Sequence, residues 1–185
     1  MIAEASDVSV DATGLESRHI SRHFLRRQSR MKRYRRYPKL TAACDNASHL
    51  IAGVDWSLGP CNDAPGFEPA IRQAAEHLSL RRVMADAAYD SEAFHVLCRK
   101  ELGAQTTAIP INLRGWDGEP TSPYRRLMHR HFPRRIFGQR WQSESVFSRF
   151  KRRLGEALTA RSDTRRHQEG LLRVLTYNLM ILAEA

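Results

Sequence analysis

Residues 37–57 read YPKLTAACDNASHLIAGVDWS, and this stretch decides the fold because it predicts two neighbouring strands. Residues 37–45 and 49–57 each contain a short run of mainly apolar residues bounded by polar ones, which is the pattern of a strand. The Asp45-Asn46 pair between them favours a short turn. The stretch therefore predicts a pair of antiparallel strands.

The segments on either side of this pair extend it into an alternating order of strands and helices. Val8 and Val10 alternate with polar residues over 7–15, which is the pattern of a half-buried strand, so three successive strands are expected to form an antiparallel meander. Helices are then expected over 68–78, 91–102, 137–154 and 164–183, with strands over 81–86 and 105–111 between the first three of them. Periodicity alone predicts only an α/β or α+β fold with a mixed sheet.

Three acidic residues follow one another along this framework. Asp11 lies in the first expected strand, within VSVDATGL, and Asp86 ends the expected strand RRVMAD. Glu144 lies on the expected helix 137–154. The three together form an Asp, Asp, Glu set in chain order.

The helix around Glu144 combines this carboxylate with two cations on one face. At about 100° per residue, Phe137, Arg140, Glu144 and Lys151 fall within roughly 60° of one another. A carboxylate that holds a divalent metal beside a phosphate needs such neighbours. An ordinary amphipathic helix with an i,i+4 Arg–Glu pair is the alternative. The stripe beside this face is apolar and consists of Val146, Phe147, Phe150 and Leu154.

In these residues the sequence resembles the DDE transposases of bacterial insertion sequences. The resemblance is to the cut-and-paste group whose third acidic residue lies in a Tyr-x2-Arg-x3-Glu-x6-Lys signature. Here the signature reads Phe137-x2-Arg140-x3-Glu144-x6-Lys151, so only its first position departs, by loss of one hydroxyl. The stretches GPCNDAPGFEPAI, ADAAYDSEAF and QRWQSESVFSRFKRRLG are also typical of these enzymes. The resemblance covers roughly residues 8–182.

The resemblance implies both a fold and a reaction. The fold is α/β, a ribonuclease-H-like mixed five-stranded sheet flanked by helices, with residues 1–185 as a single catalytic domain. The implied reaction is metal-dependent cleavage of DNA phosphodiesters followed by strand transfer. Asp11, Asp86 and Glu144 would be the catalytic residues and would hold two Mg²⁺ ions, with Mn²⁺ as the expected substitute. Asp90 is a helix-capping residue or an alternative to Asp86 as a ligand.

Cationic and aromatic residues are expected to bind nucleic acid around these carboxylates. The residues in this set are Phe137, Arg140, Lys151, Arg125 and Arg126. Arg125 and Arg126 belong to a basic loop over 112–135, which its Gly, Pro and Arg content predicts to be extended. Trp141 is expected either to pack in the core or to stack on a displaced base, with the core favoured.

Composition supports a globular, basic protein. The chain has 185 residues, 42% of them hydrophobic, and a formal net charge of +10. This length suits one domain with a core of its own. The excess of cations suits a polyanionic partner, with a merely basic surface as the alternative. Nine Arg or Lys residues fall within 18–36, a basic connection expected either to bind phosphates nonspecifically or to be a solvated loop.

The sequence also indicates a compartment. Cys44, Cys61 and Cys98 are too far apart for a zinc pattern and odd in number, which favours the reducing cytoplasm, where the chain would associate with the nucleoid. No run of 18 apolar residues is present, so no membrane-spanning helix is expected.

The resemblance further implies partners. Double-stranded DNA is expected as the substrate, both as the ends of the element and as the target, with a dimer on DNA and a monomer when free. Transposases of this group carry an N-terminal helical region that reads the terminal repeats, and this chain begins close to its first strand. The chain is therefore expected to be N-terminally truncated, with an upstream fragment as a further partner. An inactive relic that only binds DNA, or a different ribonuclease-H-like nuclease, are the alternatives.

Overall fold

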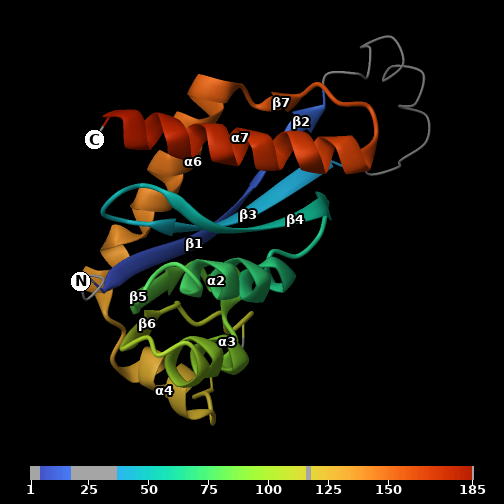
Figure 1. The fold of residues 1–185 in the computed structure, drawn as a ribbon. Helices are drawn as coiled ribbons and strands as arrows, with labels where there is room; N and C mark the ends of the chain where they lie inside the picture. The colour runs from blue at the N-terminus through green and yellow to red at the C-terminus, as the bar shows by residue number, and fades with distance from the viewer. Residues whose placement is uncertain (1–4, 18–36, 116–117, 185) are drawn as a thin grey trace, which may run out of the picture.

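A mixed sheet of five strands forms the centre of the molecule (Figure 1). The computed structural model describes residues 5–17, 37–115 and 118–184. The strands are β1 (Ser6–Gly14), β3 (Tyr37–Asp45), β4 (Ile51–Gly59), β5 (Leu80–Ala85) and β6 (Thr106–Ala108). Their order is β4-β3-β1-β5-β6, with β1, β3 and β4 antiparallel and β5 and β6 parallel to β1. This is the ribonuclease-H-like mixed five-stranded sheet that the family resemblance implied.

Helices connect and cover the strands. The α-helices are α2 (Phe67–Ala75), α3 (Glu92–Val96), α4 (Pro123–Arg130), α5 (Arg134–Phe137), α6 (Trp141–Leu154) and α7 (Asp163–Glu184). A π-helical segment (Leu97–Glu101) continues α3, and short 3-10 turns are formed by Ala64–Gly66, Ala87–Tyr89 and Gly138–Arg140. The two-residue strands β2 (Glu16–Ser17) and β7 (Ala157–Leu158) pair in parallel beyond the end of β1.

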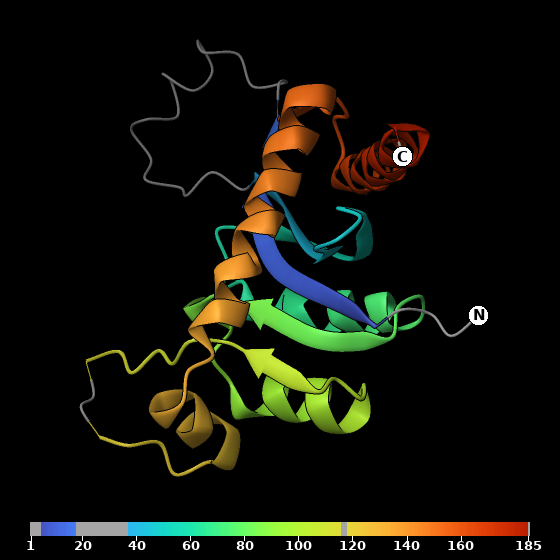
Figure 2. The same cartoon turned by 90° about the vertical axis from the view of Figure 1, so that its left-hand side faces the viewer.

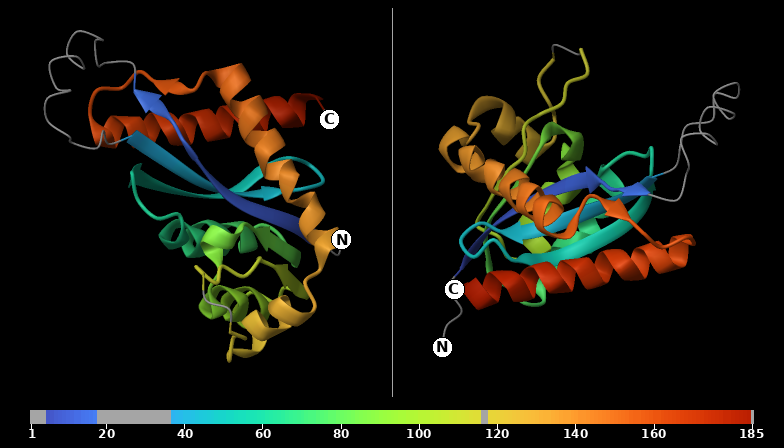
Figure 3. Two further views of the ribbon diagram at one scale, coloured as in Figure 1. Left: turned by 180° about the vertical axis from the view of Figure 1, so that it is seen from behind. Right: turned by 90° about the horizontal axis from the view of Figure 1, so that it is seen from above.

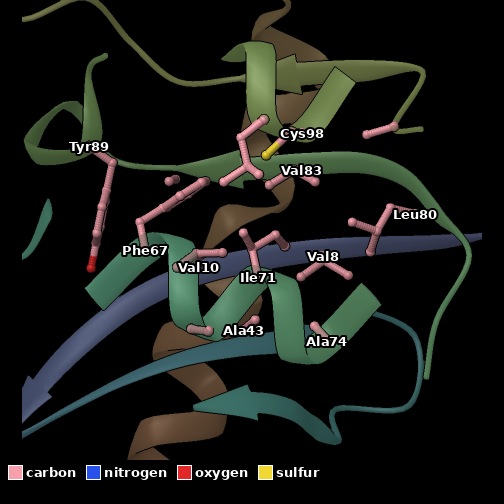
Figure 4. Close-up of a cluster of buried hydrophobic side chains, with 14 of the residues drawn as sticks. Val8, Val10, Ala43, Phe67, Ile71, Ala74, Leu80, Val83, Tyr89 and Cys98 are labelled. Atoms are coloured by element: carbon pink, nitrogen blue, oxygen red, sulfur yellow. The ribbon is translucent and has the colours of Figure 1, made fainter. Parts of the chain in front are cut away.

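One face of the sheet packs against α2 and the segment around α3. Val8 and Val10 of β1 and Val83 of β5 lie in this core together with Phe67 and Ile71 of α2, and all five side chains are buried (Figure 4). Alternate residues of a strand point to the same face, so the apolar positions of β1 and β5 meet the apolar stripe of α2. This core holds β1 and β5 side by side.

The opposite face packs against α6 and α7 (Figures 2 and 3). Leu40 and Ala42 of β3 lie in this second core beside Phe147 and Phe150 of α6. The rings of Phe150 and Tyr177 of α7 have centroids 5.9 Å apart. Because α6 is bound to the sheet along its apolar stripe, the neighbouring face of this helix lies near β1.

Two predicted segments differ from the structure. The strand expected over 105–111 is only Thr106–Ala108, because Pro110 has no N–H to donate to a ladder. The loop 112–135, expected to be extended, contains the helix α4, whose first residue is Pro123. Proline is favoured at the first helical position, so Pro123 is the local signal that marks this helix. The basic connection 18–36 lies outside the described residues.

Within the described ranges, no helix is both long enough and apolar enough to cross a membrane.

Candidate active site

Asp11 on β1 and Asp86, directly after β5, stand at equivalent positions of two parallel neighbouring strands. Val10 of β1 pairs with Ala85 of β5, and each aspartate is the next residue along its chain. Asp11 accepts a hydrogen bond from the backbone N–H of Ala12 at 2.8 Å. Asp86 accepts one from the N–H of Ala88, also at 2.8 Å, and so caps the short turn after β5. Parallel pairing therefore brings two carboxylates together that are far apart in the sequence.

Helix α6 adds the third carboxylate through an arginine. Nη1 of Arg140 donates to Oδ2 of Asp11 at 3.1 Å, and Nη2 of the same guanidinium donates to Oε1 of Glu144. The Asp11 side chain is 17% exposed, whereas that of Glu144 is 58% exposed. Arg140 is thus a positive centre between a half-buried carboxylate on β1 and an exposed one on α6.

The pKa of Asp11 depends on its burial and on the charged groups around it. Burial raises the pKa of Asp11 above its ordinary value, and the negative charges of Asp86 and Glu144 raise the pKa further. The N–H of Ala12 and the charge of Arg140 act in the opposite direction without cancelling these effects. A carboxyl whose ionisation is opposed by burial and by like charges is typical of functional sites.

Two further side chains belong to this cluster and were not singled out from the sequence. Tyr89 is fully buried, and burial together with the charges of Asp11 and Asp86 raises the pKa of its phenol. Ser143 Oγ donates to the carbonyl of Arg140 at 2.8 Å and lies 3.4 Å from Oδ2 of Asp11. Their only signal in the sequence is that each stands close to a predicted acidic residue.

The carboxylates fit a divalent cation in their chemistry. Oxygen donors from Asp and Glu are the ligands that Mg²⁺ and Mn²⁺ prefer. Among the described residues, no three acidic, histidine or cysteine side chains converge as a ready cation shell. Asp11 and Glu144 are instead both bound to Arg140, which supplies positive charge at this place.

Phe137 and Lys151 lie on different elements, Phe137 beside Arg140 and Lys151 seven residues after Glu144 on α6. The single helix expected over 137–154 is wrong at its start, because Gly138–Arg140 forms a 3-10 turn and Phe137 ends α5. Glycine is a poor helix former, which favours a break at this point. The Phe137 ring still lies 6.0 Å from Cζ of Arg140. Lys151 is partly buried on α6, and among the described residues no carboxylate forms an ion pair with it.

Arg125 and Arg126 make internal contacts. Arg125 binds the carboxylate of Asp90 through Nε at 2.9 Å and Nη2 at 2.7 Å. Arg126 donates to the carbonyls of Pro120 and Thr121 at 3.1 and 3.0 Å. These bonds hold α4 and its preceding loop in place.

The carboxylate of Asp90 is likewise held by internal hydrogen bonds. Besides Arg125, its carboxylate accepts the N–H of Asn112 at 2.9 Å. Ser91, not Asp90, is the N-cap residue of α3. The side chain of Asp90 is only 3% exposed, so its carboxylate is saturated with internal partners.

Trp141 is 56% exposed at the first position of α6, and the core position favoured from the sequence is wrong. Its place next to Arg140 leaves a large aromatic surface open to solvent beside the carboxylates.

Comparisons with known proteins give a family model and a set of solved structures. The family model described as "Transposase DDE domain" matches residues 3–179. No curated protein sequence is significantly similar to the chain. Eight chains of solved structures match, among them the catalytic core domain of BIV integrase. That match has a TM-score of 0.41 and 17% sequence identity, and covers 82% of this chain and 67% of the integrase chain.

Proposed function

Because this chain belongs to the family of transposase DDE domains, we propose that it cleaves DNA phosphodiesters and transfers DNA strands in transposition, with divalent metal ions. The observation that supports this proposal is the link from Asp11 on β1 to Glu144 on α6 through Arg140, beside Asp86 at the end of β5. We propose residues 1–185 as a single catalytic domain, and the two ends of an insertion element and a target duplex as its substrates.

Asp11, Asp86 and Glu144 are the proposed ligands of two Mg²⁺ ions, or of Mn²⁺ in their place. When bound, such ions supply an activated oxygen nucleophile and neutralise charge on the phosphate. Asp11 is the central ligand in this proposal because the negative charges of both Asp86 and Glu144 raise its pKa. A bound cation would favour the ionised form of Asp11 and so oppose the burial and like charges that raise its pKa.

Arg140 is proposed to change partners when DNA binds. In the free protein its guanidinium donates to Asp11 and Glu144. With the two carboxylates engaged by other cations, the planar fork of Arg140 would be available to bind a phosphate through two parallel hydrogen bonds. Lys151, on the same helix, adds a point charge toward the DNA backbone.

Aromatic side chains complete the proposed DNA surface. Trp141 offers an exposed ring that can stack on a base. Phe137 packs edge-on against Phe132, with ring centroids 5.1 Å apart, and its ring centroid lies 6.0 Å from Cζ of Arg140. Arg125 and Arg126 are proposed to reinforce this surface chiefly by holding α4 in place.

The test is cleavage and strand transfer on DNA that carries the flanking ends of the native locus, with Mg²⁺ or Mn²⁺. Glu144→Gln should abolish the products while DNA binding remains, because this change removes one charge from an exposed side chain. Glu76→Gln is the matched control, since Glu76 is an exposed glutamate at the C-cap of α2, on the opposite face of the sheet. Its products should equal those of the unmodified protein.

Other results would redirect the proposal. Salt-sensitive DNA binding without products from any protein would indicate a DNA-binding relic, or a catalytic half that needs an upstream fragment. Cleavage without any strand-transfer product would indicate a different nuclease of the same fold. Equal activity of Glu144→Gln and the unmodified protein would exclude the proposed site.

A further inference from the structure

Helix α7 has an apolar face toward its own domain and a second apolar face toward solvent. Gly170, Val174, Tyr177 and Ile181 are buried and point toward the sheet and α6. On the other side, the exposed leucines are Leu171, Leu172, Leu175, Leu179 and Leu182, with exposed fractions of 40, 63, 55, 57 and 59%. Folding of the domain therefore accounts for only one of the two faces.

The exposed leucines have the spacing of a helix–helix seam. From Leu172 the steps to Leu175, Leu179 and Leu182 are three, four and three residues. Alternation of three and four places side chains in a line along a helix that packs beside another helix at about 20°. Gln168 precedes the line by four residues, and together with Leu171, Leu172 and Leu175 it lines a hollow of about 430 Å³. The outer face of α7 is thus shaped to receive side chains of a second helix.

The position of α7 leaves this face open. The helix runs along the outside of the molecule above β3 and β4 (Figures 1 and 3). Contiguous apolar surface of this kind marks an interaction site in a soluble protein. The site is separate from the three carboxylates, which lie on β1, directly after β5 and at the start of α6.

The small number of charged side chains on this face indicates which kind of partner it can bind. Between Leu171 and Ala183 the one charged side chain is Arg173, which is bound to Glu169 and to the carbonyls of Gly155 and Ala157. A neutral strip does not attract DNA phosphates or an acidic protein. In a chain with a net charge of +10, it is instead a surface on which two copies can meet with no like charges at the contact itself.

We propose that two copies of this chain dimerise through α7, with the two helices antiparallel. With the two-fold axis between Leu175 and Leu179, Leu172 of one copy meets Leu182 of the other, and Leu175 meets Leu179. The charges in the first turns of α7 are balanced, because Asp163 and Glu169 offset Arg165 and Arg166. Antiparallel pairing places the positive N-terminal end of each helix dipole near the negative C-terminal end of the partner's helix, whereas parallel pairing would bring like ends together.

The first test is the mass of the full chain by analytical ultracentrifugation, after removal of nucleic acid, over about 1–100 µM and at low and high salt. The unmodified protein should dimerise within this range and remain dimeric at high salt, because the contact is apolar. Leu175→Gln with Leu179→Gln should raise the dimer dissociation constant at least about tenfold. Both side chains are more than half exposed, so circular dichroism should show a folded protein.

Val96→Gln with Leu127→Gln is the matched control, because these exposed apolar residues lie on α3 and α4. The control should leave the dissociation constant unchanged. A monomer at every concentration, or a dimer that the α7 variant does not weaken, would overturn the proposal. The measurement uses no DNA or metal, so its outcome is independent of the proposed catalytic activity.

Cysteine cross-linking tests the orientation in a Cys61→Ser background, because Cys61 is the exposed cysteine whereas Cys44 and Cys98 are buried. Leu172→Cys mixed with Leu182→Cys should give a disulfide-linked dimer under mild oxidation. Each of these proteins alone should stay uncross-linked. Covalent dimers from each protein alone would indicate a parallel pair and would overturn the antiparallel arrangement.

Discussion

Nη1 of Arg140 lies 3.1 Å from Oδ2 of Asp11, although the two residues are 129 positions apart in the chain. This pair joins the central strand β1 to the start of α6, and it brings the site together. The same guanidinium also binds Glu144. Arg140 thus forms ion pairs with two of the proposed metal ligands at once.

Asp11→Asn should stabilise the protein at neutral pH. Burial and the charges of Asp86 and Glu144 raise the pKa of Asp11, so the folded state holds its proton more tightly than the unfolded state does. Stability from this group is therefore present at acid pH and is lost as pH rises through the folded pKa. Urea unfolding at pH 7 should give a higher free energy of unfolding for Asp11→Asn. The difference should vanish in acid, and a less stable variant at pH 7 would contradict the expectation.

Mn²⁺ or Mg²⁺ should raise the melting temperature of the protein. A ligand that binds the folded state alone stabilises it by about 2.7 kcal/mol at 100 times its dissociation constant. Differential scanning calorimetry at millimolar metal should show the rise in the unmodified protein and in Glu76→Gln. The rise should be lost in Asp86→Asn and in Glu144→Gln. A metal-induced rise of equal size in all four proteins would place the binding elsewhere.

Trp141→Ala should weaken DNA binding without a loss of stability. The ring is 56% exposed, so little packing is removed. Stacking on one base contributes about 1–3 kcal/mol, which corresponds to a loss of roughly 5- to 150-fold in affinity. The measurement is fluorescence titration of DNA with 2-aminopurine near the cleavage site, with Leu127→Ala as the exposed control on α4. Unchanged affinity and unchanged fluorescence in Trp141→Ala would exclude stacking.

Gly53→Ala should destabilise the fold. A Cβ at Gly53 of β4 would collide with the carbonyl oxygen of Ala70 and would lie 2.7 Å from the backbone nitrogen of Ala74, both on α2. Backbone atoms of a packed helix cannot move aside cheaply, so the expected cost is about 1–3 kcal/mol or more. Gly138→Ala is the matched control, because a Cβ there meets nothing within 4 Å. Thermal unfolding of the two variants should separate them clearly.

Stability should fall as pH is lowered from about 6.5 toward 4, in part because of His95. Burial lowers the pKa of His95 to about 4, with Glu92 and Asp90 opposing this effect and Arg99 and Arg125 adding to it. The unfolded chain takes up this proton at an ordinary pKa near 6.5, so acid favours unfolding by an amount on the order of 3 kcal/mol.

The variant that checks this is His95→Gln. Its amide can keep the contact that Nδ1 of His95 makes with Oγ1 of Thr107 at 2.7 Å, and it does not titrate. Between pH 7 and pH 4.5 the variant should lose less unfolding free energy in urea than the unmodified protein. Equal losses in the two proteins would show that the imidazole does not contribute.

The order of the strands and of the main helices could be predicted from the sequence, because it depends on local signals. The choice of Asp11, Asp86 and Glu144 as site residues came from the family resemblance and stays a prediction. The period of apolar residues placed β1, β3, β4, β5 and α2 within a few residues of their observed bounds. The Asp45-Asn46 turn set the first antiparallel pair. Pro123 was a local signal for α4, but the basic composition around it obscured the helix.

Contacts between distant segments could not be predicted in the same way, because they depend on how the elements pack. The sequence alone left open whether Arg140 pairs with Glu144 on its own helix or is a cation for DNA phosphates, and it did not indicate Asp11. The packing of α6 on β1 decided that Arg140 binds Asp11 as well as Glu144. Packing also left Trp141 and the outer leucines of α7 exposed and bound Arg125 to Asp90. Periodicity identifies which residues of a helix are apolar, and only the tertiary structure decides which of its faces is covered.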